Sequence, residues 1–178
     1  MNKKAYWVLP VIAIVAMALV VSGCKSTAEK AAEKSIEKAT NGAADVDLDN
    51  NSVTINTNGG SYQAGENVTL PSGFPSDVYI IDGTLKAAMT QETGNSFIVS
   101  IETSKSVTQA KTSYEKEIAD DGWTITTNMT YSGTVTLMAE KSNRTLGVGV
   151  SEVDGKTMVN ISTSTNAANT NIPTPDDN

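Results

Sequence analysis

The chain has 178 residues, enough for a domain of about average size, and a formal net charge of −7. This acidic balance, with Arg144 as the single arginine, argues against a nucleic-acid-binding surface, which needs clustered Lys or Arg. Histidine is absent, so the commonest general base is missing. We therefore predict a protein that is not an enzyme and does not bind nucleic acid.

The first 24 residues hold the strongest motif of the chain. Two lysines near the start precede an apolar run over residues 5–21, and the only cysteine follows in the order Val21-Ser22-Gly23-Cys24. This pattern resembles the signal sequence of bacterial lipoprotein precursors. Two other interpretations are an uncleaved membrane anchor and an ordinary secretory signal peptide. The run is shorter than the roughly 20 residues that a spanning helix needs.

The resemblance implies a role for each residue of the motif. Val21, Ser22 and Gly23 would be recognised by the signal peptidase, and cleavage after Gly23 would remove the signal peptide 1–23. Cys24 would carry a covalent diacylglycerol, palmitate among its acyl chains, and could accept an N-linked acyl chain. The protein is then expected in the cell envelope, held to the membrane on its extracytoplasmic side. That membrane would be the outer one if the cell has two, since Lys25 is not the aspartate associated with inner-membrane retention.

The segment after the cysteine predicts a helix. Residues 25–41 are rich in Ala, Glu and Lys, and Ser26 with Glu29 has the spacing of a capping box. Because Ile36 is the only large apolar residue, we expect the helix to bury little. Residues 24–44 are therefore predicted to be the lipidated N-terminus and a helical stalk.

Strand patterns begin near residue 45. Residues 51–57 and 61–64 predict a hairpin around an Asn-Gly-Gly turn, and residues 85–90 and 96–102 predict a second one. Between them, residues 70–77 contain two prolines and a glycine, which indicate an ordered loop.

The clearest helix is predicted over 107–121, with Ser106 and Gln109 at capping-box spacing and Gly122 at its end. The segment 106–123, a helix followed by Gly-Trp and a strand, is similar to a unit found in small bacterial envelope proteins. That resemblance implies a fold and no activity.

Four further strands are predicted at 123–130, 134–141, 144–151 and 156–163, each with one apolar face. The parity of the first one groups Met129 with the apolar positions that begin at Trp123.

The predicted fold class is α+β: hairpins and then a four-strand meander in an antiparallel sheet, with one main helix (about 107–121) packed on one face. We assign residues 45–164 to this domain. Residues 165–178 are polar and without periodicity, which predicts a disordered tail.

Two sets of side chains are weak candidates for a site. Asp45, Asp47 and Asp49 alternate along a strand and would offer oxygen ligands suited to calcium, but Asn50 and Asn56 stand where a calcium loop needs Gly and Glu, which favours a solvated strand edge guarded by charge. Phe74, Tyr79 and Ile81 gather around the irregular loop, either as an exposed recognition patch or as residues that close the core.

The sequence therefore predicts a lipid-anchored cell-envelope protein that acts as a non-catalytic binding module. Its partners would be the membrane, through the lipid anchor, and an envelope protein or polymer. A lipoprotein that binds a small ligand or calcium is the alternative. We expect no cofactor beyond the covalent lipid.

Overall fold

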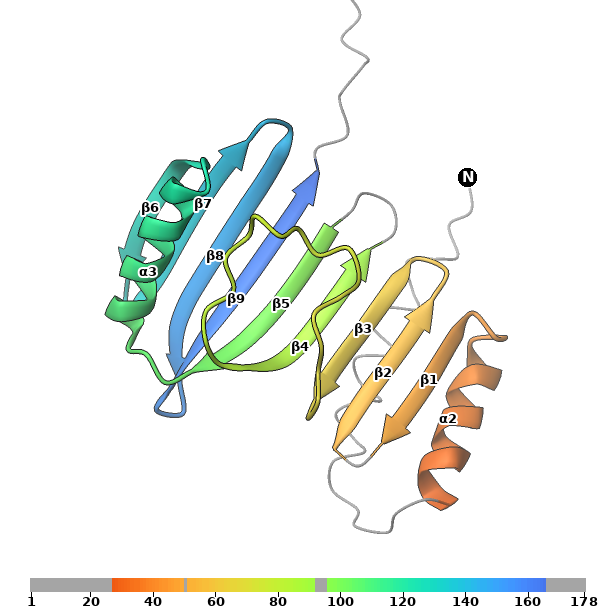
Figure 1. Ribbon diagram of the computed structural model, residues 1–178. Helices are drawn as coiled ribbons and strands as arrows, with labels where there is room; N and C mark the ends of the chain where they lie inside the picture. The colour runs from red at the N-terminus through yellow and green to blue at the C-terminus, as the bar shows by residue number, and fades with distance from the viewer. Residues whose placement is uncertain (1–26, 50, 92–95, 166–178) are drawn as a thin grey trace, which may run out of the picture.

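The computed structural model describes residues 27–49, 51–91 and 96–165 (Figure 1). The predicted signal peptide, the motif around Cys24 and the predicted tail after Thr165 lie outside the described residues. Among the described helices, none is long and apolar enough to cross a membrane.

Nine strands and two helices make up the described part of the chain. In chain order they are α2 (Thr27–Ala39), β1 (Ala44–Asp49), β2 (Ser52–Thr57), β3 (Gly60–Gly65), β4 (Thr84–Gln91), β5 (Ser96–Thr103), α3 (Val107–Asp120), β6 (Thr124–Tyr131), β7 (Thr134–Lys141), β8 (Arg144–Val153) and β9 (Lys156–Thr165). All nine strands belong to one antiparallel sheet with the order β1-β2-β3-β4-β5-β9-β8-β7-β6.

The predicted architecture, with a four-strand meander packed on one face by one main helix, is wrong. The meander β6–β9 does form, but β9 pairs with β5, so the hairpins and the meander are one nine-stranded sheet. The β5–β9 pairing joins Val99 to Ile161, residues that no local pattern relates. Its cause is that both strands present an unbroken buried face and each supplies the hydrogen bonds the other lacks.

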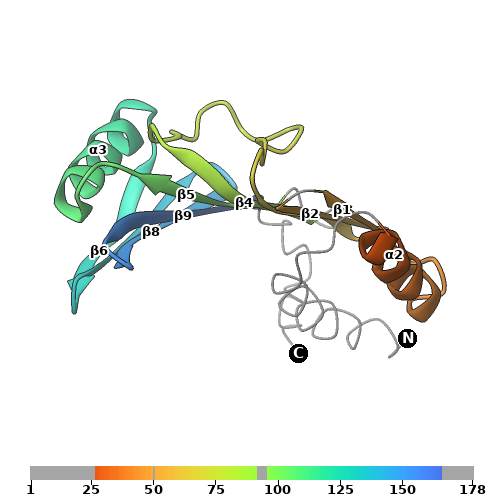
Figure 2. The same ribbon diagram turned by 90° about the horizontal axis from the view of Figure 1, so that it is seen from below.

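The two helices pack on opposite faces of this sheet. Ile55 pairs with Tyr62 and Tyr62 with Met89, so the three side chains share the face that α2 covers. Ala88 lies next to Met89 in β4 and points the other way, into the core under α3. We call these the α2 face and the α3 face. Figure 2 shows α3 on the upper side of the sheet in that view, and α2 at the end of the sheet opposite to α3.

The main core lies on the α3 face. The helix is held at its start by the predicted capping box, in which the Ser106 hydroxyl accepts from the Gln109 N–H and the Gln109 side chain accepts from the Ser106 N–H. It buries Ala110, Tyr114 and Ile118. At about 1.5 Å per residue, its 14 residues span about 21 Å, which covers only the β6–β8 side of the sheet. Over β4, β5 and β9 this face is covered by the loop 66–83 (Figure 1).

A smaller core lies under α2. Ile36 packs against the buried residues Ala44, Val46 and Ile55, and the Glu33 carboxylate accepts a hydrogen bond of 2.9 Å from the Leu48 N–H. The helix predicted as a stalk therefore contacts the sheet along β1. The contact arises because β1, which no sequence pattern marked as a partner, presents alternating apolar residues toward it.

Bulges in β4, between Leu85 and Ala87, and in β6 change which side chains face the core. In β6 the register shifts between Ile125 and Thr127, so Met129 pairs with Thr136 on the α2 face. The prediction that Met129 shares the apolar face with Trp123 is therefore wrong. The extra residue in the bulge reverses the alternation that the parity argument assumed.

Candidate functional site

The loop 66–83 joins β3 to β4 and crosses the α3 face over β4, β5 and β9 (Figure 1). It contains no helix or strand, yet it is held in place by buried side chains. Val78 and Ile81 enter the main core, and Ile81 is only 1% exposed. The backbone makes two local turns, closed by hydrogen bonds from Phe74 N–H to Pro71 O and from Val78 N–H to Pro75 O. The predicted ordered loop is confirmed.

Two aromatic contacts attach the loop to its neighbours. Phe74 meets Phe97 of β5 edge to face, with ring centroids 5.7 Å apart. Tyr79 meets Tyr114 of α3 in the same way at 5.2 Å. Edge-to-face pairs at this separation are favourable beyond the area that they bury. The loop is thus connected to the sheet on one side and to the helix on the other.

An ion pair fixes the middle of the loop. The Asp77 carboxylate accepts hydrogen bonds from both terminal nitrogens of Arg144, one of them at 2.8 Å, and from Lys141 Nζ at 2.7 Å. The hydrogen bond from Arg144 and then that from Lys141 hold the pKa of Asp77 well below its usual range, against an opposing effect of burial. The same contact with Asp77 raises the pKa of Arg144.

Trp123 completes this arrangement. Its Nε1–H donates to the Asp77 backbone carbonyl at 2.9 Å, and the Arg144 guanidinium lies 4.8 Å from the centre of its ring system. Lys141 also donates to the Asp121 carbonyl at the end of α3, at 2.7 Å. We call Asp77, Trp123, Lys141 and Arg144 the Asp77 clasp. It ties the loop, the end of α3 and the β7–β8 hairpin together.

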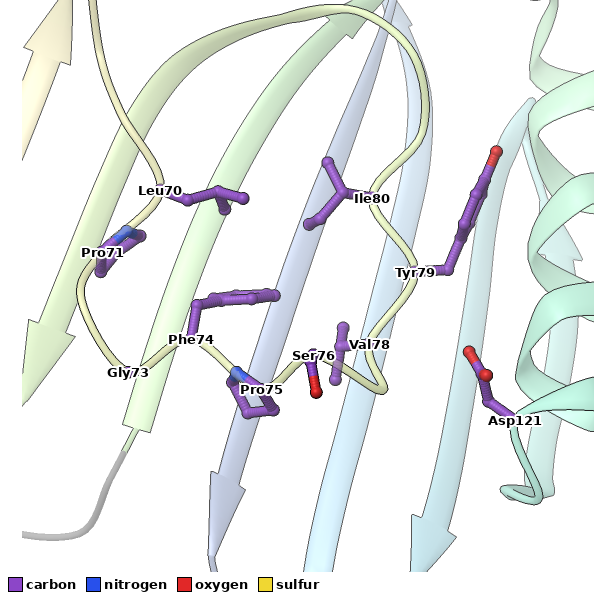
Figure 3. Close-up of a pocket in the computed structure, with 10 residues that line it drawn as sticks. All are labelled: Leu70, Pro71, Gly73, Phe74, Pro75, Ser76, Val78, Tyr79, Ile80 and Asp121. Atoms are coloured by element: carbon purple, nitrogen blue, oxygen red, sulfur yellow. The ribbon is translucent and has the colours of Figure 1, made fainter.

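A hollow of about 480 Å³ opens in the loop that the clasp holds (Figure 3). Figure 3 shows Leu70 and Ile80 pointing toward each other across the loop, with Phe74 below them. Leu70 is 41% exposed and the ring of Phe74 is half-buried. The lining residues are Leu70, Pro71, Gly73, Phe74, Pro75, Ser76, Val78, Tyr79, Ile80 and Asp121.

The lining decides what the hollow can hold. Most of it is aliphatic, aromatic or proline, and the only side chains with polar groups are Ser76, Tyr79 and Asp121. No lining residue is a histidine, lysine or arginine, so the hollow offers no cationic side chain for an anion. Such a surface can accept an apolar group, with a hydroxyl or a carboxylate at its rim.

The structure separates the three residues predicted around this loop. Phe74 and Tyr79 both line the hollow, whereas Ile81 is a core residue. Among the lining residues that the sequence candidates omitted, Leu70 is a large apolar residue that is 41% exposed, and its position directly before a proline in the loop was the available sequence signal. Asp121 comes from the distant end of α3, and no sequence pattern relates it to the loop.

The three aspartates proposed for calcium lie on β1, an edge strand. Asp45, Asp47 and Asp49 point to the face opposite α2 and are exposed. Same-face neighbours on a strand are about 6.6 Å apart, so their carboxylates spread along the edge rather than converge. Within the described ranges, no group of three or more His, Cys, Asp or Glu could hold a metal ion.

Comparison with known proteins gives one match. A family described as START domain-like is similar to residues 84–166, somewhat less than half of the chain. This range runs from β4 to the end of β9 and includes α3. The loop that carries the hollow lies immediately before it. No curated protein and no solved structure matches the chain.

Proposed function

We propose that this protein is a non-catalytic binding protein of the cell envelope, anchored to a membrane by lipid on Cys24, and that it binds through the hollow in the loop 66–83. The anchor rests on the resemblance of residues 21–24 to a lipoprotein signal. The binding role rests on one observation: an irregular loop that is rigidly held around an open apolar hollow.

The way the loop is held supports this role. A loop needed only to cover the core could lie flat on the sheet, with its apolar side chains pointing inward. Here Val78 and Ile81 do point inward, while Leu70 remains 41% exposed and faces Ile80 across the hollow. Because the Asp77 clasp fixes the loop before any ligand arrives, little conformational entropy is lost on binding.

The size of the hollow indicates the kind of ligand. Sites for small molecules commonly enclose roughly 300–1,000 Å³. A volume of about 480 Å³ admits one large apolar side chain of a partner, or an apolar ring of a polymer or small ligand. We propose an envelope protein or polymer as the first candidate, because the hollow is open toward solvent at Leu70 and can be reached by a group that projects from a larger surface.

A small apolar ligand is the second candidate. The similarity to a START domain-like family over 84–166 favours it, because domains of this kind are generally binding domains. In that case the ligand would lie against Phe74 and Tyr79, with a polar group at the Asp121 end of the hollow.

Photo-crosslinking in cells tests the proposal and separates its two forms. A photoreactive amino acid at Leu70 of the full chain is expected to give one reproducible adduct, whose mass shows whether it is a macromolecule or a small molecule. The matched control places the same group at Val153, which is 50% exposed at the far end of the β8–β9 hairpin. Equal adducts at both positions, or none at Leu70, would contradict the site.

The anchor is tested separately with Cys24→Ala. Wild-type protein is expected to incorporate radiolabelled palmitate and to sediment with membranes. The variant should lose the label and keep the uncleaved signal peptide 1–23, seen as a higher mass. A variant that still carries the label would show that Cys24 is not the lipidated residue, without bearing on the hollow.

A further inference from the structure

The two edges of the nine-stranded sheet differ in protection. Among the described strands, β1 and β6 each have a hydrogen-bonded neighbour on one side only. β1 carries Asp45, Asp47 and Asp49, and α2 packs along it. Charges and covering elements are the usual means by which proteins prevent an edge strand from pairing with another chain. β1 is therefore guarded.

β6 is protected on one face and at its start only: α3 packs against its α3 face, where the Asn128 Nδ2–H donates to the Glu115 carboxylate at 2.6 Å, and a bulge lies at its start. Its sequence, TITTNMTY, contains no charged residue and no proline, and residues 126–131 are all exposed. The bulge lies at its start, between Ile125 and Thr127, so residues 127–131 keep a regular edge. Thr and Tyr, which favour strands, supply three of these five residues. The strand is thus a free template for backbone pairing.

The side chains along this edge form an apolar surface. Met129 and Tyr131 are 53% and 78% exposed, and both point to the α2 face, since they pair with Thr136 and Thr134. Met138 of the neighbouring strand is exposed on the same face. An exposed aromatic residue and two methionines at a free strand edge are typical of a surface that another chain covers.

We propose that β6 pairs with β6 of a second copy of this chain, antiparallel and about a two-fold axis, so that the two sheets continue into one another. This proposal does not depend on the hollow.

Charge permits two copies to pair at β6 and disfavours their pairing at β1, the other edge of the sheet. The protein carries a net charge of −7, so two copies repel each other over most of their surfaces. At β6 an antiparallel pair places only uncharged residues of 127–131 opposite one another, and no like charges meet. The aspartates of β1 would face each other in the equivalent pairing at the other edge, which excludes that arrangement. An isologous pair also closes after two copies and cannot grow into a fibre.

A single-cysteine scan tests this geometry. Each residue from 127 to 131 is replaced in turn by cysteine in the full chain, and membranes are oxidised and analysed for a disulfide-linked dimer. Across a two-fold axis only residues near the axis face their own copies, at the separation that a disulfide needs. We expect the dimer yield to peak at one position and to fall steeply on both sides, because adjacent side chains point to opposite faces and only the residue at the axis faces its own copy. The wild-type chain measures any background from Cys24, and Asp47→Cys is the control at the guarded edge.

A charge substitution provides the second arm. Met129→Lys places two like charges across the proposed pair, and the dimer formed by cysteine at a neighbouring position is expected to fall about tenfold or more. Val153→Lys is the matched control, since Val153 has the same exposure (50% against 53%) and lies away from the edge. Thermal unfolding of both variants checks that they remain folded. A yield of disulfide-linked dimer that is the same at all positions from 127 to 131, or that Met129→Lys does not change, would overturn the proposal.

Discussion

The Asp77 clasp gives the sharpest test of how the loop 66–83 is held. In Asp77→Asn the carboxylate that accepts from Arg144 and Lys141 is lost, while the size of the side chain is kept. Hydrogen bonds to charged groups contribute about 1.5–3 kcal/mol each when well formed. The Asp77 side chain is 29% exposed, so solvent reduces this contribution, and the two cations are left close together. We expect a loss of about 2 kcal/mol in the free energy of unfolding.

The measurement is urea denaturation of the full chain followed by tryptophan fluorescence, which reports on Trp123 beside Arg144; the other tryptophan, Trp7, belongs to the predicted signal peptide. At this chain length, 2 kcal/mol corresponds to a fall of about 4–8 °C in Tm. Asp82→Asn is the matched control, because Asp82 belongs to the same loop and is exposed. We expect Asp82→Asn to unfold at the same urea concentration as the wild type. If Asp77→Asn also unfolds at that concentration, the clasp does not stabilise the loop.

The difference in the free energy of unfolding between wild type and Asp77→Asn should depend on pH, which tests whether the ionised carboxylate of Asp77 is its cause. The pKa of Asp77 is lower in the folded than in the unfolded protein, where 3.8 is the ordinary value. A group of this kind stabilises the fold fully above its unfolded pKa and loses that contribution as the pH falls toward its folded pKa. The gap between wild type and Asp77→Asn should therefore be constant from about pH 5 to pH 7 and narrow below pH 3.8. A gap that does not change down to pH 3 would exclude the ionised carboxylate as the cause.

Three further predictions concern stability, measured by thermal or urea unfolding. Ser106→Ala removes the cap of α3 and should cost about 1 kcal/mol, whereas Ser106→Gly should cost a few tenths; equal losses would show that the hydroxyl does not cap the helix. Tyr114→Phe should change stability by less than about 1 kcal/mol, because the buried hydroxyl makes no well-formed hydrogen bond among the described residues, the Ile81 backbone being its polar neighbour. A loss near that of a core truncation would contradict this. Gly83→Ala should destabilise clearly, because its Cβ would lie 2.3 Å from the Glu102 carbonyl oxygen in the adjacent strand; a neutral result would show that β4 and β5 can separate there.

The proposed sites lie at different places on the molecule. The hollow is formed by the loop 66–83 and the end of α3, on the α3 face of the sheet. The free edge at β6 ends the sheet, and its exposed apolar side chains Met129 and Tyr131 point to the α2 face. A dimer through β6 would therefore leave both hollows open to their ligands.

Local patterns were sufficient for most elements of this fold. Alternation of apolar residues placed the strands to within a few residues, and the spacing of Ser106 and Gln109 placed the start of α3. Asp154-Gly155 predicted the last hairpin turn, and both residues have the positive φ that such a turn requires, 51° and 75°. These features depend on neighbours in sequence, whose geometry is set by bond rotation and hydrogen bonding over a few residues.

Only the tertiary structure decided how these elements combine. The pairing of β5 with β9 made one sheet of two predicted parts, and a one-residue bulge in β6 turned Met129 from the core to the surface. Asp77 meets Arg144 across 67 positions of the chain. Each of these features depends on which distant segments can bury apolar area and satisfy backbone hydrogen bonds together. No window of a few neighbouring residues contains that information. The sequence pointed to the loop, whereas its hollow exists because α3, the sheet and the clasp hold that loop in one shape.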